Sequence, residues 1–461
     1  MLDQETAAAT PRPIPSPKGL PILGVLPSLL RHPFPFLMAT ASRYEGLVCL
    51  NIGPIRAYLV SHPDYVRRIL VDNHANYHKG KIMEGIRIAL GNGLFTADGD
   101  LWRRQRRLMA PVFHRRHILQ MIDMMTAAAD ERMQTWQLRI DHGDPVDMLQ
   151  ELTLFNIDLI LKTLFGATIS KADAQIVLEA TQGVFLGMSK RVWAFFVPRG
   201  VPLPGQRAYQ QAIARLDTVV NRLVDERRSS GEQFDDLLSM LLAARDDETG
   251  EGMTNSQLRD EIFTIFLAGY ESTATGLSWA LYLLSQHEDI DRKLRDEVDA
   301  VLGQRRPTLE DIPKLTYTRM IIDETLRLYP SFPMYFRTSI GSDTLGPYQI
   351  PAGAPIILSP YATHHDPAFW EEPERFDPER FAPGLVSVGA KRAYYPFGQG
   401  ERLCIGRDFS IIEATAVLSM IVQRYDRVLA PGTTIEPHYA MSLTARHGVP
   451  LLLHCRSTLP G

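Results

Sequence analysis

The stretch "YYPFGQGERLCIGRDF", residues 394–409, places a cysteine between a glycine-rich loop and the first turn of an apolar helical pattern. A lone cysteine is a buried core residue, a nucleophile or a metal ligand, and the core is the usual place for it. Gly398, Gly400 and Gly406 favour another reading, because glycines let the backbone approach a bulky group and turn N–H groups towards a sulfur. A helix N-terminus just after Cys404 also favours the thiolate. The stretch therefore predicts a stabilised thiolate at Cys404.

The composition limits what this thiolate can do. Cys49, Cys404 and Cys455 are far apart and form no CxxC pair, so neither a disulfide framework nor a zinc module is indicated, and we expect a reducing compartment. A nucleophile needs a positioned base, and none of the 13 histidines stands in a motif that recommends it. A single thiolate is sufficient for an iron that brings its own ring of nitrogens. Arg402 would then pair with a carboxylate of the macrocycle.

Five motifs in order carry a resemblance to a known family. Phe397, Gly400, Arg402, Cys404 and Gly406 reproduce FxxGxRxCxG, and the sequence resembles a cytochrome P450. The other motifs are "WRRQR" at 102–106, "AGYEST" at 268–273, "ETLR" at 324–327 and "PERF" at 378–381. "PERF" also occurs at 373–376, but the order in the family points to the second copy. The resemblance covers essentially residues 20–455, and implies the soluble bacterial type, near its fatty-acid and terpene hydroxylases.

The chain of 461 residues is 45% hydrophobic and carries a net charge of -4, so it can bury a large core and gives no sign of a nucleic-acid surface. Alternating β-formers at 46–63 predict a small sheet, helical spacing dominates from Asp64, and strand signals return at 344–361 and 448–455. The expected fold is mainly α with a minor β part. The resemblance implies the triangular helical prism of the P450 fold, with a long central distal helix.

The N-terminus divides into a leader and the start of the domain. Residues 1–19 are proline-rich, lack a signal peptide and are expected to be a flexible leader, with a single domain over 20–461. Prolines break the apolar segment that follows, so we expect no transmembrane anchor. A cytoplasmic monomer is the expected state.

Residues 258–286 predict a buried helix roughly 43 Å long. Gly269, Glu271, Ser272 and Thr273 lie at its middle, where a buried carboxylate beside hydroxyls is costly unless it is hydrogen-bonded or used. By resemblance, Glu271 and Ser272 form the acid–alcohol pair of the family, with serine where threonine is usual. Thr273 can share this role, and the sequence leaves open which hydroxyl takes part.

The resemblance implies a haem b cofactor with Cys404 as the iron ligand. Trp102 and Arg106 are implied as partners of the haem propionates, and the further haem-binding candidates are Lys79, Arg337, Phe397 and Arg402. Arg103, Arg104 and Arg107 are left to face outward, and such a basic patch would suit an acidic electron-transfer protein. Glu324 and Arg327, three residues apart on a predicted helix, can pair. In the family this pair joins an arginine like Arg380 to hold the thiolate loop, which is a structural role.

The candidate substrate residues are mostly apolar, so binding would rest on hydrophobic transfer and the substrate is expected to be a lipophilic fatty acid, terpene, steroid or polyketide. They are Leu94, Phe95, Val184, Phe185, Ala268, Pro333, Met334 and Met441. A carboxylate-binding arginine is not evident among them, which favours a neutral scaffold.

The expected activity is a monooxygenase of secondary metabolism that hydroxylates or epoxidises this substrate with dioxygen. No GxGxxG fingerprint is present and the chain leaves no room for a fused flavin reductase. Electrons are therefore expected from NAD(P)H through a ferredoxin or flavodoxin and its reductase. The alternatives are a peroxide-driven peroxygenase, a haem-thiolate isomerase, and a haem sensor or carrier without turnover.

Overall fold

The computed structural model describes residues 11–166, 170–193, 203–230, 236–439 and 441–456. It separates into two compact units. Unit 1 comprises Met1–Gly80, Pro333–Arg375 and Val386–Cys404, and unit 2 comprises Lys81–Phe332, Phe376–Leu385 and Ile405–Gly461. The boundary falls directly after Cys404. The one-domain expectation for 20–461 stays a prediction.

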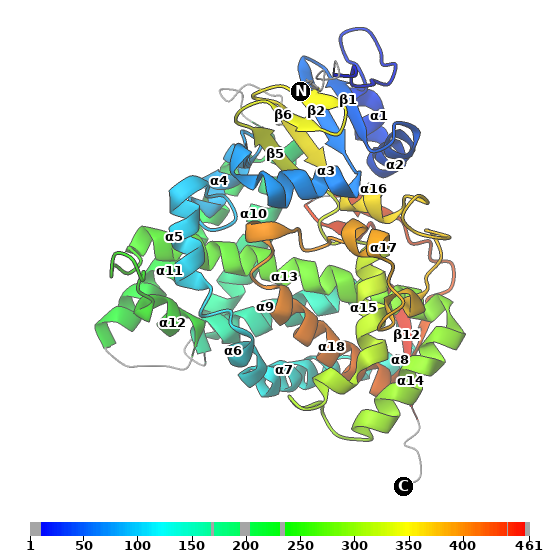
Figure 1. Cartoon of the computed structure of the whole chain (residues 1–461). Helices are drawn as coiled ribbons and strands as arrows, with labels where there is room; N and C mark the ends of the chain where they lie inside the picture. The colour runs from blue at the N-terminus through cyan, green and yellow to red at the C-terminus, as the bar shows by residue number, and fades with distance from the viewer. Residues whose placement is uncertain (1–10, 167–169, 194–202, 231–235, 440, 457–461) are drawn as a thin grey trace, which may run out of the picture. The chain divides into compact units, whose positions relative to one another are not determined.

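Unit 1 is built on a five-stranded sheet in the order β1-β2-β8-β5-β3, in which only β2 and β8 are parallel. Figure 1 labels β1, β2 and β5 of this sheet. Buried side chains from these strands, including Cys49, form its core, so this cysteine is an ordinary apolar core residue. The elements of unit 1 are α1 (Leu26–Arg31), α2 (Pro33–Arg43), β1 (Leu47–Ile52), β2 (Ile55–Val60), α3 (Pro63–Arg67), η1 (Arg68–Asp72), η2 (His74–Asn76), β3 (Tyr77–His78), β5 (Tyr335–Ser339), β6 (Asp343–Leu345), β7 (Tyr348–Ile350), β8 (Pro355–Leu358), α16 (Pro360–His364), α17 (Val388–Ala393) and η6 (Gly400–Arg402).

The described part of the proline-rich leader lies against unit 1. Arg12 N–H donates to the Pro347 carbonyl at 2.9 Å, and Cys49 N–H donates to the Pro15 carbonyl at 2.8 Å. These bonds tie Arg12 to the turn between β6 and β7, and Pro15 to β1. The flexible leader expected over 1–19 falls in part on residues 1–10, which lie outside the described residues.

Unit 2 is mainly helical, and the mainly α fold with a minor β part is confirmed. Its small sheets are β4-β12-β9 and β10-β11. Among the described residues, no helix is both long and apolar enough to span a membrane. The elements are α4 (Met83–Leu90), α5 (Gly99–Met109), α6 (Arg115–Gln120), α7 (Ile122–Gln134), α8 (Gln137–His142), β4 (Val146–Asp147), α9 (Met148–Phe165), α10 (Lys171–Trp193), α11 (Gln206–Ser230), α12 (Leu237–Ala243), α13 (Asn255–Gln286), α14 (Glu288–Leu302), η4 (Ile312–Lys314), α15 (Thr316–Leu328), η5 (Pro378–Phe381), α18 (Arg407–Arg424), β9 (Tyr425–Leu429), β10 (Pro437–Tyr439), β11 (Leu443–Ala445) and β12 (Pro450–Cys455).

The long helix α13 is confirmed, and it begins three residues earlier than the pattern at 258–286 predicts. A capping box starts it: the Thr254 hydroxyl accepts the Gln257 N–H at 3.2 Å, and the Gln257 side chain accepts the Thr254 N–H at 3.0 Å. Helix α9 packs along α13, and a Cβ at Gly269 would lie 2.7 Å from Ile160 Cδ1. The glycine therefore allows the two helices to approach closely, which offsets its weak helix propensity.

Candidate active site

The loop that carries Cys404 is closed on itself within unit 1. Cys404 N–H donates to the Phe397 carbonyl at 3.0 Å, and Gly398 N–H donates to the Tyr395 carbonyl at 3.0 Å. The Cys404 side chain is exposed, and none of the three cysteines is in a disulfide. The loop therefore presents an accessible thiol on a fixed backbone.

Gly400 has a positive φ of 71°, and a Cβ there would lie 2.2 Å from the Leu70 carbonyl oxygen on η1. Glycine at this position thus serves the packing of the loop on η1, in addition to any close approach to a ligand. Next to it, Glu401 pairs with His74 Nε2 at 3.2 Å. Both contacts fix the segment that holds Arg402, which lies in η6 and is partly exposed.

Strand β5 holds the Cys404 loop from another side. The Tyr335 hydroxyl donates to the Pro396 carbonyl at 2.6 Å. Burial and then the negative charge of nearby Cys404 raise the pKa of Tyr335, so the phenol stays neutral and remains a donor. Sequence reasoning missed Tyr335; the available signal was that a buried tyrosine hydroxyl needs a partner.

Four other candidate residues of unit 1 lie on or next to β5. Arg337 is in this strand, and its Nη1 donates to the Phe336 carbonyl at 2.8 Å. Lys79 directly follows β3, which pairs with β5, the strand that carries Arg337. Pro333 and Met334 are buried at the start of β5. The structure therefore brings two basic candidates and two apolar candidates to the strand that supports the Cys404 loop.

In unit 2, the middle of α13 has three carbonyl groups that accept hydrogen bonds from side chains. The Ser272 hydroxyl donates to the Ala268 carbonyl at 2.9 Å. Asn156 Nδ2 donates to the Tyr270 carbonyl at 3.1 Å, and the Ser331 hydroxyl donates to the Ser272 carbonyl at 2.8 Å. Asn156 and Ser331 were missed, because they come from segments far away in the sequence. They fix the backbone that carries Glu271 and Ser272.

Glu271 is largely buried, and desolvation raises its pKa to about 8, although the Ser442 hydroxyl counteracts part of this rise. At neutral pH this side chain is therefore mainly a neutral acid. A protonated carboxyl group is a proton donor, which is the role that the sequence predicted for it.

Thr273 has different neighbours from Ser272. Its hydroxyl donates to Ser410 Oγ on α18 at 3.2 Å. Glu413, one helical turn further along α18, is 2% exposed, and burial raises its pKa, with a hydrogen bond to Thr273 opposing the rise. The two hydroxyls left open by the sequence are thus engaged separately, one within α13 and one towards α18.

The apolar candidates of unit 2 differ in how far they are buried. Val184 and Leu94 are buried, and Phe185 meets Tyr270 of α13 edge-on at 5.8 Å. Ala268 is exposed on α13, Phe95 is partly exposed, and Met441 is buried beside Ser442. The contact of Phe185 with Tyr270 places α10 against the same stretch of α13 that carries Glu271.

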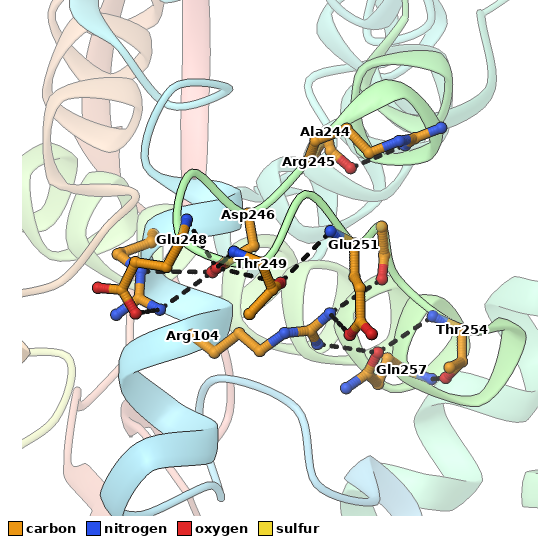
Figure 2. A network of polar contacts seen from close by, with 11 residues as sticks. Arg104, Ala244, Arg245, Asp246, Glu248, Thr249, Glu251, Thr254 and Gln257 are labelled. Carbon is orange, nitrogen blue, oxygen red and sulfur yellow. Dashed lines mark hydrogen bonds and ion pairs between the residues drawn. The ribbon is translucent and has the colours of Figure 1, made fainter.

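Trp102 is buried and Arg106 partly exposed on α5, one helical turn apart and on one face. The prediction that Arg104 and Arg107 simply face outward was wrong. Arg107 Nη2 lies 3.1 Å from Asp246 and 2.9 Å from Glu248, and Arg104 Nη2 donates to the Gly252 carbonyl at 3.1 Å. Figure 2 shows Arg104 beside the loop between α12 and α13, which carries Asp246, Glu248, Thr249 and Glu251. Of the three, Arg103 is the exposed one, paired with Asp100 at 2.5 Å.

The pair of Glu324 and Arg327 on α15 is confirmed, and it is completely buried rather than at the surface. Arg327 Nε and Nη2 donate to the Glu324 carboxylate at 2.6 and 2.8 Å. Arg380 Nε lies 3.5 Å from the same carboxylate, which also accepts the Asp377 N–H at 3.0 Å. The second "PERF" copy is therefore the partner, as the motif order predicts, and the cluster ties η5 to α15.

The described residues contain no group of three or more His, Cys, Asp and Glu side chains that could hold a metal ion. The family profile "Cytochrome P450" matches residues 14–453. The chain belongs to the cytochrome P450 family. This membership implies a haem, and makes the protein a monooxygenase that acts on a lipophilic substrate.

Two curated relatives come from Streptomyces melanosporofaciens. Cyclooctatin synthase is 35% identical over 93% of this chain and 93% of its own length. Cyclooctat-9-en-7-ol 5-monooxygenase is 35% identical over 91% of this chain and 90% of its own length. Among solved structures, the heme domain of cytochrome P450DA matches with a TM-score of 0.89 and 27% identity, covering 97% of this chain and 99% of that one. These P450 relatives span the chain almost completely.

Proposed function

We propose that this P450 binds haem b through the Cys404 thiolate and oxidises a neutral, cyclic lipophilic molecule of the terpene class. The observation that carries the proposal is the accessible thiol of Cys404 on a loop closed by its own backbone bonds. The Cys404 loop fits a haem, because the thiolate must be accessible to the iron while a rigid backbone holds the cysteine in place. When bound, the haem supplies the activation of dioxygen.

Basic and aromatic side chains would hold the haem. Arginine suits carboxylates because its guanidinium binds them with two parallel hydrogen bonds. The candidates for binding the propionates would be Trp102, Arg106, Arg337, Arg402 and Lys79, and Phe397 would contribute an aromatic side chain. The position of Lys79 directly after β3, the neighbour of the strand that carries Arg337, and the common face of Trp102 and Arg106 on α5 support this assignment.

Within α13, Glu271 would hold a proton and Ser272 would pass it on. Glu271 is suited to this task because its pKa of about 8 keeps it protonated at neutral pH. Ser272 lies next to it, and its hydroxyl is already oriented by the Ala268 carbonyl. Thr273 would support the helix through α18 instead, because its hydroxyl bonds with Ser410.

A neutral terpene scaffold is supported by the apolar character of the candidate pocket residues and by the relative that acts on cyclooctat-9-en-7-ol. A role in secondary metabolism follows from that substrate class. Electrons would come from NAD(P)H through a ferredoxin or flavodoxin and its reductase, and we propose a cytoplasmic monomer.

The test is the spectrum of the reduced, carbon-monoxide-bound protein. Wild type should show the red-shifted Soret band of thiolate ligation, and Cys404→Ser, checked for retained fold by circular dichroism, should lack it. The same band in Cys404→Ser would remove this residue from the iron. Turnover with electrons and dioxygen is expected to exceed turnover with peroxide, and full activity with peroxide alone would favour a peroxygenase instead.

A further inference from the structure

The segment that carries Leu94 and Phe95 is fastened to α13 by two carboxylates. Asp260 accepts the Asn92 N–H at 2.7 Å, and Glu261 accepts the Leu94 N–H at 2.9 Å. Glu261 is completely buried and Asp260 is 8% exposed. Since a buried carboxylate is costly without hydrogen bonds, and a buried N–H equally needs an acceptor, each group stabilises the other.

The backbone of this segment lies flush against α13. A Cβ at Gly91 would sit 2.1 Å from Asp260 Oδ1, and Gly91 has a φ of 55°, which favours glycine. A Cβ at Gly93 would sit 2.2 Å from Thr264 Oγ1 and 2.6 Å from the Asp260 carbonyl oxygen. There is no space for a side chain between the segment and the helix.

The segment is also braced from within. The Thr96 hydroxyl donates to the Gly91 carbonyl at 2.7 Å and contacts the Gly93 carbonyl at 3.2 Å. Arg87 on α4 donates to the Thr96 carbonyl at 2.7 Å. Residues 91–96 thus have bonds at both ends and in the middle, whereas a lid that opens for substrate entry is expected to have few.

We propose that Glu261, together with Asp260, is a positioning residue that clamps residues 91–96 to α13, so that Leu94 and Phe95 form a fixed wall of the substrate site. This inference rests on the proposed role of Leu94 and Phe95 in binding a lipophilic substrate. A fixed wall selects ligands by shape, because it does not move to admit a larger ligand and loses no conformational entropy when a ligand of matching shape binds. The enzyme should therefore discriminate sharply by the girth of cyclic substrates.

The test compares Glu261→Ala with Glu151→Ala in the haem-loaded protein. Glu151 on α9 is also buried, at 6% exposed, but it holds Trp136 at 2.9 Å and has no part in the clamp. It therefore controls for the general effect of removing a buried carboxylate from unit 2. The readouts are amide hydrogen exchange of residues 92–97 and the spin shift on titration with menthol, cedrol and progesterone, probes of increasing girth.

Glu261→Ala should raise exchange at residues 92–97 by roughly tenfold or more, as loss of a hydrogen bond to a charged group implies. It should also reduce the difference in Kd between the probes. Exchange and probe selectivity that match those of Glu151→Ala would overturn the proposal.

Gly93→Ala provides a second variant if Glu261→Ala does not fold. It wedges the segment away from α13 without altering a carboxylate, and should loosen the same amides; unchanged exchange would again overturn the clamp. Failure of wild type to show thiolate-bound haem would sink the proposed function instead, and the exchange comparison would still decide the clamp.

Discussion

The cluster of Glu324, Arg327 and Arg380 should be the most sensitive ionic element of unit 2. Glu324 and Arg327 are both 0% exposed, and the carboxylate meets two guanidinium groups and a backbone N–H. Glu324→Gln removes the negative charge while it keeps the shape of the side chain. The buried charge of Arg327 then lacks its counter-charge, which typically costs about 3–5 kcal/mol.

This cost is large because a folded domain is stable by only about 5–15 kcal/mol. We therefore expect Glu324→Gln to lose about a fifth or more of the free energy of unfolding, and to retain less haem at a given temperature. The assay is urea denaturation followed by circular dichroism, with the Soret absorbance recorded in parallel.

The matched control is Glu226→Gln on α11. Glu226 pairs with Arg222 at 2.9 Å, but the two side chains are 58% and 43% exposed. Such a pair is worth about 0.2–1 kcal/mol. If Glu324→Gln were no more destabilising than Glu226→Gln, burial would not be what makes the Glu324 cluster important, and the reasoning would fail.

Four further predictions concern charge and pH. Because the pKa of Glu271 is raised to about 8, the product that wild type forms per electron consumed should fall as the pH rises above about 8. Glu271→Gln should lack this alkaline decrease. Its persistence in the variant would exclude Glu271 as the proton donor. Because the pKa of Glu271 is higher in the folded state than in the unfolded state, ionisation of Glu271 destabilises the folded protein as the pH rises from the unfolded-state pKa towards 8. The Tm of Glu271→Gln should therefore rise relative to the Tm of wild type over this range. Asp246→Asn should lower Tm more than Glu248→Gln, because the Asp246 side chain is buried and that of Glu248 is 68% exposed; equal shifts in thermal unfolding would contradict this. The Arg305 guanidinium holds the pKa of Asp311 well below its usual range, so the stability that this pair contributes should be lost as the pH falls below about 4. Asp311→Asn should therefore flatten the acid part of the profile of Tm against pH. An unchanged acid part in the variant would exclude this pair as its cause.

Local patterns in the sequence predicted the elements that depend on neighbouring residues. The helical spacing at 258–286 predicted α13 apart from its first residues, and the three-residue separation of Glu324 and Arg327 predicted their pairing. Both features depend on residues one or two helical turns apart, so the local sequence is sufficient to predict them.

Burial and long-range partners escaped prediction. The complete burial of the Glu324 pair and the partners of Arg107 and Arg104 were not predicted, because other segments cover or meet these side chains. Tyr335, which holds the Cys404 loop through Pro396, escaped for the same reason: the two residues lie 61 positions apart.

By itself, the sequence determined the family, the mainly α fold and the residue types available for chemistry, because the motif around Cys404 and the helical periodicity are local properties of the chain. Only the tertiary structure decided how those residues are held. The raised pKa of Glu271, the bond of Thr273 with Ser410 and the fastening of Leu94 to Glu261 all depend on desolvation and on hydrogen bonds between distant segments. Those quantities arise only when the chain has packed.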